Sequence, residues 1–267
     1  MRRILVALLL MAGALAWRGA GPAVAAEPEP RAVLAPSGVL KAALYTGTPT
    51  SILPDPKSGG PRGVGYDLGK ELAKRLGVPY EPVVFAKNAD VLAAIKSGAA
   101  DVAFTNSSSA SRAKDMDFGP AFMDVELGYL VPKGAALANV ADVDTAGLRV
   151  GVTAGSSSDA TLSRDFKHAE VVRVTNFDAG IEMLSAGKLD AYATNKASLF
   201  EMSEKVAGSK VLDGRWGVEH FAVAIPKGRD QAMPFLRQFT NEVKSEGLVN
   251  AAITRAGLRG AVTSAAE

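Results

Sequence analysis

Two segments of the chain repeat one pattern of apolar and polar positions. Residues 95–106 and 184–195 each carry Gly, Asp, Thr and Asn at identical spacing. Each copy predicts the last turn of an amphipathic helix, a Gly that ends it, and a short buried strand that finishes in Thr-Asn. For one copy alone, chance recurrence in an α/β protein explains the pattern about as well as a related architecture does. Four matched positions in register favour two related lobes. Each lobe is then expected to present a polar strand end to a shared cleft.

The rest of the chain alternates between strand and helix patterns. The apolar run at 39–45 predicts a first strand, and a Gly/Pro/Ser-rich loop over 46–65 follows it. Leu recurs every four residues across 66–76 before Gly77, which predicts a helix with a clear end. The other expected strands are 80–86, 101–105, 125–131, 148–153, 171–174, 190–194 and 219–225, and the other expected helices are 90–97, 158–166, 177–186, 197–206 and one or two between 231 and 256.

Strands that alternate with helices of this length predict an α/β fold with parallel sheets and right-handed crossovers. Two of the strands, 125–131 and 219–225, run into the same Pro-Lys-Gly sequence. Pro-Lys-Gly is also an ordinary surface turn, but here the two copies flank the middle series of strands and helices. We interpret them as two hinge crossings, with lobe 1 discontinuous over 38–131 and 222–260 and lobe 2 over 132–221.

The first 26 residues have the pattern of a secretory signal peptide. Two Arg residues precede an apolar run over 4–17, and small residues then supply a cleavage site after Ala25 or Ala26. A membrane anchor is the alternative, but the run is shorter than the roughly 20 residues that a spanning helix needs. Residues 27–37, rich in Pro and Ala, are expected to be disordered.

Charge and cysteine content narrow the classes of function. The chain has 30 Lys and Arg against 28 Asp and Glu, and without the three Arg of the leader the balance is 27 against 28. Because no basic stripe remains, no nucleic acid partner is expected. The chain has no Cys, which excludes disulfides and a lipid anchor on a Cys after the leader. We expect a soluble protein of the bacterial periplasm, with a monomer as the default.

The densest polar cluster, residues 105–112, directly follows a buried strand. Asn106, Ser107 and Ser109 supply polar groups, and the Arg112 guanidinium can hold two oxygens at once, which suits a carboxylate or a similar planar anion. The carboxyl end of a strand is also where open α/β sheets bind ligands. A solvated Ser-rich loop with a surface Arg is the alternative.

A second polar turn lies in the expected second lobe. Gly155, Ser156 and Ser157 lead from a strand into a helix, and the free N–H groups and hydroxyls at a helix start suit the same kind of anion. Helix capping alone explains about half of this signal.

Enzymatic and metal signals are weak. His168 and His220 show no ligand spacing, and no nucleophile elbow, P-loop or dinucleotide motif is present. No metal and no cofactor are therefore expected. Asp124 and Glu126 share a strand face and are candidate paired carboxylates, although charges at a sheet edge are the simpler explanation.

An ordered set of short motifs resembles family 3 of the periplasmic solute-binding proteins of ABC importers, a group best known for polar amino acids. The resemblance implies a two-lobe periplasmic binding protein fold of type II, each lobe a mostly parallel sheet flanked by helices. It further implies that the lobes close on a small-molecule solute and deliver it to an inner-membrane permease, without catalysis. The motifs lie at 65–77, 101–104, 111–118, 150–156 and 187–191.

The resemblance also implies roles for individual residues. Arg112 would hold the α-carboxylate of the solute, with Ser107 or Ser109 and with Ser157 sharing the task. Asn195 stands where amino-acid binders usually carry an Asp for the ammonium group, and a neutral amide offers no charge compensation there. An acid at position 195 is then expected to favour solutes that bear an ammonium.

The first-lobe loop also lacks the usual Pro-aromatic pair, so that a stacking wall is either missing or supplied by Tyr45. We therefore hypothesise that the solute is a small carboxylate or another organic anion, with a standard α-amino acid as the close second choice. The alternative is an enzyme similar to the cyclohexadienyl dehydratases, which share this fold. It would need a general acid, for which Glu126 or Glu219 is the candidate.

Overall fold

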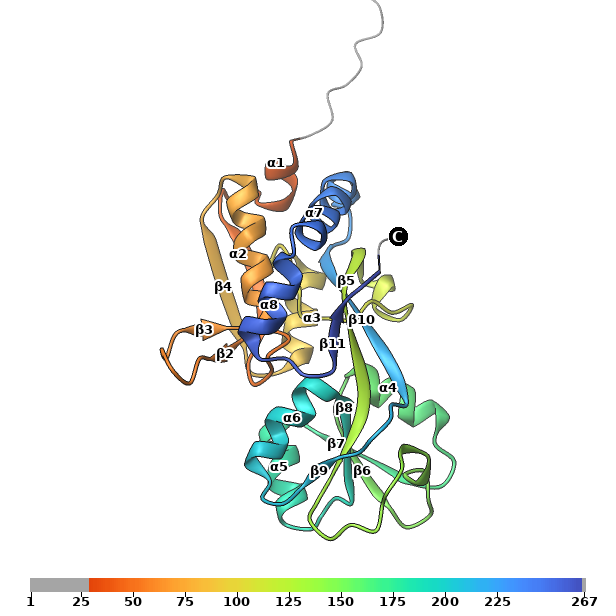
Figure 1. The fold of residues 1–267 in the computed structure, drawn as a ribbon. Helices are drawn as coiled ribbons and strands as arrows, with labels where there is room; N and C mark the ends of the chain where they lie inside the picture. Colours follow the sequence, from red (N-terminus) through yellow and green to blue (C-terminus); the bar gives the residue numbers. More distant parts are fainter. Residues whose placement is uncertain (1–28, 266–267) are drawn as a thin grey trace, which may run out of the picture.

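Two long strands connect the two lobes of the molecule (Figure 1). The computed structural model describes residues 29–265, so the predicted signal peptide and its cleavage site lie outside the described residues. Strands β5 (Met116–Val131) and β10 (Gly217–Pro226) pair antiparallel along most of their length. The chain thus crosses between the lobes twice, as the sequence predicted, but it does so within β5 and β10, and the two Pro-Lys-Gly sequences lie at the ends of these strands. The bounds of the lobes stay a prediction because β5 and β10 run along both.

Strand β5 begins nine residues before the strand expected at 125–131. Gly119 and Pro120 concealed this part of the strand, since both residues weaken or interrupt a ladder. The pairing register between β5 and β10 shifts on either side of Ala222, opposite this segment. Such a bulge tolerates a residue that has no N–H to donate.

The upper lobe in Figure 1 packs helices around a short parallel sheet. Strands β1 and β4 pair in parallel, and the expected strand at 101–105 is reduced to single bridges from Val102 to β1 and from Ala103 to β10. The break between the last two helices falls at Gly247, whose φ is +74°. The elements of this lobe are α1 (Pro30–Leu34), β1 (Leu40–Tyr45), β2 (Leu53–Pro54), β3 (Pro61–Arg62), α2 (Val64–Leu76), β4 (Tyr80–Phe85), α3 (Asn88–Ser97), α7 (Met233–Ser245), α8 (Leu248–Ala256) and β11 (Ala261–Thr263).

The disorder expected over 27–37 is wrong for the residues that the structure describes. Residues 30–34 form α1, and the Leu34 side chain is fully buried in the core of the upper lobe. The Pro at the first turn of α1 has a fixed φ that suits a helix start. A Pro-rich and Ala-rich composition was therefore a poor guide, because Leu34 and Ala35 are buried in the core and Val33 packs against it.

The lower lobe is built on a mixed sheet with the strand order β10-β5-β8-β6-β7. Strands β7, β6 and β8 are parallel, whereas β5 runs antiparallel to β8. The elements of this lobe are β6 (Arg149–Thr153), α4 (Ser157–Asp165), β7 (Glu170–Val174), α5 (Phe177–Ser185), β8 (Ala191–Asn195), α6 (Lys196–Lys205) and β9 (Lys210–Val211). No helix in residues 29–265 is long and apolar enough to cross a membrane.

The two copies of the repeat share the end of their helix and the role of their Asp, although only the second copy forms a full strand, β8. Gly98 and Gly187 both have a positive φ at a helix end, as the pattern predicts. The carboxylate of Asp101 accepts a hydrogen bond from the Lys41 backbone N–H at 3.0 Å, and that of Asp190 accepts one from Arg149 at 2.8 Å. In each lobe the repeated Asp therefore ties its strand to the start of the neighbouring strand.

Tyr192 fills the core of the lower lobe under the sheet. It is fully buried, and its hydroxyl bonds to Thr153 Oγ1 at 2.7 Å. A Cβ added at Gly151 or at Gly180 would come within 2.7 or 2.5 Å of the Tyr192 ring. Both positions therefore require glycine so that β6 and α5 can approach the ring.

Candidate functional site

The polar strand ends of both lobes meet around one cavity. Thr105 and Asn106 from the upper lobe and Thr194 and Asn195 from the lower lobe all line an inner cavity of about 50 Å³. The shared cleft expected from the repeat is thus present. A wider outer cavity of about 690 Å³ adjoins the inner one, and Arg112 lines both of them.

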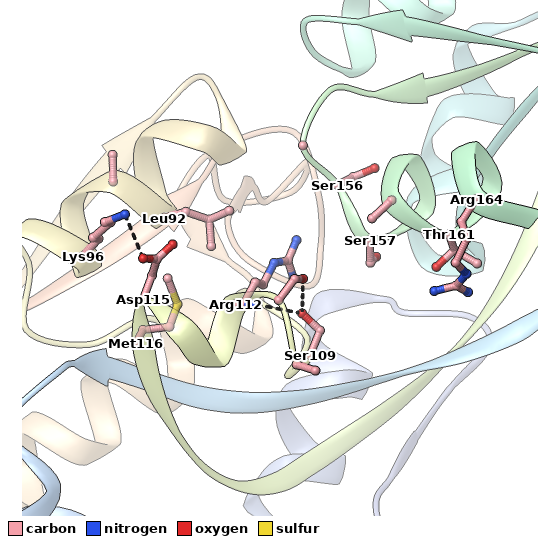
Figure 2. Close-up of a pocket in the computed structure, with 15 residues that line it drawn as sticks. Leu92, Lys96, Ser109, Arg112, Asp115, Met116, Ser156, Ser157, Thr161 and Arg164 are labelled. Carbon is pink, nitrogen blue, oxygen red and sulfur yellow. Dashed lines mark hydrogen bonds and ion pairs between the residues drawn. The ribbon is translucent and has the colours of Figure 1, made fainter.

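Arg112 lies at the junction of the two cavities, facing the start of α4 (Figure 2). Its Nη1 donates to both the backbone oxygen and the hydroxyl of Ser107, each at 3.0 Å. Its Nε and Nη2 find no acceptor among residues 29–265. Burial lowers the pKa of the Arg112 guanidinium, while the nearby charge of Glu219 acts in the opposite direction. An Arg nevertheless stays protonated at neutral pH, so the site presents a half-buried cation with unused donors.

The two serines of the polar cluster at 105–112 have different positions. Ser107 is buried against the inner cavity, where its hydroxyl lies between Arg112 and Glu219. Ser109 lines only the outer cavity, and its hydroxyl accepts from the Arg112 backbone N–H at 3.3 Å and contacts Ser111. Ser109 therefore shapes the loop that carries Arg112.

The second polar turn is largely occupied with starting α4, as the capping alternative expects. The Gly155 N–H donates to the Asp159 carboxylate at 3.0 Å, and the Ser156 hydroxyl accepts from the Asp159 N–H at 3.0 Å. The Ser157 hydroxyl instead donates across the cleft to Glu219. The backbone N–H groups of Ser157 and Ser158 find no acceptor among the described residues, so the positive end of α4 stays free at the cavity.

Asn195 is held on both sides of its amide. Its Oδ1 accepts from the Ser198 N–H at 3.0 Å as the N-cap of α6, and its Nδ2 donates to Glu219 at 3.2 Å. Tyr45 packs against Phe177 with ring centroids 5.7 Å apart. Burial raises the pKa of the Tyr45 hydroxyl to about 12, so it stays protonated and available as a donor.

Glu219 is the central residue that sequence reasoning missed as a binding group. It is buried, lines the inner cavity, and accepts hydrogen bonds from Ser107, Ser157 and Asn195. The alternation of side chains between the two faces of β10 could have indicated that Glu219 is buried, because Glu219 shares a face with the buried Phe221. Buried acidic groups need a reason to be there.

Glu126 lies outside both cavities. Its carboxylate pairs with Lys196 at 2.8 Å and with Arg215 at 3.0 Å. The hydrogen bond from Lys196 is the main cause that lowers the pKa of Glu126. Glu126 is therefore a structural anion held by two ion pairs, but the explanation as an edge charge is wrong, because β5 is an interior strand that pairs with β10 on one side and β8 on the other.

The first-lobe loop adds polar groups that no motif indicated. Thr48 contacts Thr50 at 2.9 Å and reaches across the cleft to Ser198 at 2.8 Å, hydroxyl to hydroxyl. All three line the inner cavity. The length of the loop over 46–65 was the available signal.

Unpartnered polar atoms concentrate at this cavity. Of the four buried side-chain polar atoms that lack a partner in the described residues, three belong to residues that line the inner cavity. They are Tyr45 Oη, Thr105 Oγ1 and Asn106 Nδ2. A buried polar group without a partner costs about 1–3 kcal/mol, so a polar guest in the cavity would be stabilising.

Comparisons with a family model and with known proteins agree on one family. The model of the bacterial extracellular solute-binding proteins, family 3, matches residues 42–255. The ABC transporter glutamine-binding protein of Bacillus subtilis (strain 168) is 23% identical over 198 residues, which cover 73% of this chain and 72% of that protein.

Solved structures share the fold. The solute receptor for L-cysteine of Neisseria gonorrhoeae superposes with a TM-score of 0.74 at 23% identity, covering 85% of this chain and 93% of that one. An ancestral amino acid-binding protein, described as a precursor of cyclohexadienyl dehydratase, gives a TM-score of 0.70 at 23% identity, with coverages of 82% and 95%.

These neighbours confirm the expected α/β architecture, a periplasmic binding protein fold of type II. The family match includes both crossing strands and both copies of the repeat. The binding roles of individual residues stay predictions. The chain belongs to the bacterial extracellular solute-binding proteins, family 3.

Proposed function

We propose that this protein captures a small carboxylate-bearing solute, an organic anion or an amino acid, in the cleft between its lobes. The lobes close on the solute, and the closed form delivers it to an inner-membrane ABC permease. The protein acts as a monomer in the periplasm after cleavage of its leader behind Ala25 or Ala26. The family supports transport, because the name of the Bacillus subtilis relative is that of an ABC transporter component.

One observation carries the proposal: a half-buried Arg with unused donors lies at a cavity where unpartnered polar atoms gather. A carboxylate would accept from two N–H groups of Arg112, in the planar geometry that guanidinium favours. The free N–H groups at the start of α4 face the same anion from the other lobe. Because the contacts come from both lobes, a bound solute would favour closure.

A thermal-shift screen over amino acids and simple carboxylates finds the solute, since a ligand of the folded state raises the melting temperature. Calorimetry then compares the wild type with Arg112→Ala. We expect the variant to lose on the order of a hundredfold in affinity, because a charged partner of a buried anion is removed. Arg237→Ala, on the exposed surface of α7, is the matched control and should bind normally. Equal affinity of Arg112→Ala and wild type would refute the proposal.

A dehydratase activity is the second candidate, favoured by one observation. The carboxyl of Glu219 lines the inner cavity, where a general acid would be needed. The test is turnover of prephenate or arogenate by the wild type and by Glu219→Gln. Product formation that this substitution abolishes would show an enzyme rather than a binding protein.

A further inference from the structure

We propose that Glu219, on the second crossing strand, supplies the negative charge that holds an ammonium group in the cleft, so that the site selects zwitterionic amino acids over simple carboxylates. The inference rests on the proposed function and names the class of solute. It replaces the expectation that a neutral Asn195 leaves the ammonium without a counter-charge.

The contacts of Glu219 are neutral. Its Oε1 accepts from the hydroxyls of Ser107 and Ser157, and its Oε2 accepts from the Asn195 amide at 3.2 Å. No Lys, Arg or His among residues 29–265 comes within ion-pair distance of it. Hydroxyls and amides satisfy its hydrogen bonds but do not neutralise its charge. The charge of Arg112 acts on Glu219 only from beyond ion-pair distance, and a buried charge without a directly bonded partner is costly.

Asn195 is poorly placed to receive an ammonium. Its oxygen already caps α6 through the Ser198 N–H, and its amide nitrogen, which is a donor, points at Glu219. The Asn195 amide therefore orients the Glu219 carboxylate, and Glu219 is the acceptor that remains at this end of the cavity.

One hydroxyl lies between the two charges. The Ser107 hydroxyl lies 3.0 Å from Arg112 Nη1 and 3.4 Å from Glu219 Oε1, so one hydroxyl links the cation to the anion. An α-amino acid carries its carboxylate and its ammonium on one carbon. A solute beside Ser107 can therefore present its carboxylate to Arg112 and its ammonium to Glu219.

The charge balance of the cavity favours the same class. Arg112 and Glu219 are the two charged side chains that line the inner cavity, so their formal charges cancel. A simple carboxylate would neutralise Arg112 but leave Glu219 beside a second anion. A zwitterion pairs both, and such charge complementarity sets specificity more than overall affinity.

The test uses matched pairs of probes. L-Glutamine is compared with 4-carbamoylbutanoate, L-cysteine with 3-mercaptopropanoate and L-alanine with propanoate, each by calorimetry. The wild type should bind the amino acid of at least one pair more tightly. In Glu219→Gln, which keeps the shape but not the charge, the affinity for that amino acid should fall on the order of a hundredfold, while that for its partner is unchanged or tighter.

The double variant N195D/E219Q is the rescue. It exchanges the acid and the amide, so the hydrogen bond between them can reverse its direction while the formal charge of the cavity is kept. We expect it to restore the preference for the amino acid, and it serves as the folded variant if E219Q alone is unstable.

Three outcomes separate the claims. Loss of amino-acid preference in E219Q, or its return in the double variant, supports the inference. A wild type that prefers the des-amino probes, or an E219Q that keeps its preference for the amino acid, overturns the inference while the proposed function stands. If no probe binds the wild type, or if Arg112→Ala binds as well as the wild type does, the proposed function fails first.

Discussion

Asn195→Asp alone tests where Glu219 lies. The Asn195 amide nitrogen is 3.2 Å from Glu219 Oε2, so the substitution would place two carboxylates in contact. At that distance, two unit charges repel by about 5 kcal/mol at an effective dielectric constant of about 20. An acid is also a good N-cap for α6, and its negative charge at the start of this helix offsets about 0.5–1 kcal/mol of the repulsion. After relaxation, we expect the free energy of unfolding to fall by about 3 kcal/mol at pH 8.

The loss should depend on pH. Repulsion raises the pH at which one carboxyl of the new pair takes up a proton in the folded state, above the value in the unfolded chain. The destabilisation is therefore full at alkaline pH and shrinks as the pH falls and the pair takes up that proton. Urea unfolding of the wild type, N195D and N195D/E219Q at pH 8 and pH 5 measures this. The double variant, with one acid in the pair, should lack the effect.

Equal stability of N195D and the wild type at pH 8 would contradict the position of Glu219. This expectation differs from the one drawn from sequence, in which an acid at 195 improved binding of ammonium groups. That argument treated position 195 in isolation, whereas the structure places an acid beside it.

Two further predictions concern the scaffold. Asp190→Asn should lower the free energy of unfolding by about 1 kcal/mol at pH 7, because the carboxylate accepts from the backbone and side chain of Arg149. The hydrogen bond from the Arg149 side chain lowers the pKa of Asp190, so this stabilisation is present above the unfolded value and is lost as the pH falls through the folded one. Urea unfolding should therefore show a smaller difference between the variant and the wild type at pH 3 than at pH 7. Gly180→Ala should cost about 1–3 kcal/mol in thermal unfolding, since its Cβ would lie 2.5 Å from the Tyr192 ring. Gly60→Ala, whose nearest neighbour would be 3.5 Å away, is the control, and equal melting of the two variants would refute the packing argument.

The repeat made the architecture predictable from sequence. Gly ends both helices, the repeated Asp anchors both strands, and the Thr-Asn pairs of both copies line one cavity. These features are local consequences of residue type, so a pattern of spacing was sufficient. Arg112 could also be predicted from the sequence, because it follows a polar loop at a strand end.

Long-range contacts were beyond the reach of local patterns. Glu219 enters the cavity because β10 crosses between the lobes, and its partners are 24 to 112 residues away in sequence. Likewise, Gly119 and Pro120 hid the start of β5, which the pairing with β10 maintains. The charge balance of the cleft depends on this tertiary arrangement, and so no local pattern could bring Glu219 into the choice between an organic anion and an amino acid.

The most direct test of the central claim is a crystal structure of the protein with a solute found in the thermal-shift screen. We predict the carboxylate of that solute within hydrogen-bond distance of the Arg112 guanidinium, and the start of α4 contacting it from the other lobe. A solute whose carboxylate lies away from Arg112, with the guanidinium still bonded only to Ser107, would contradict the account.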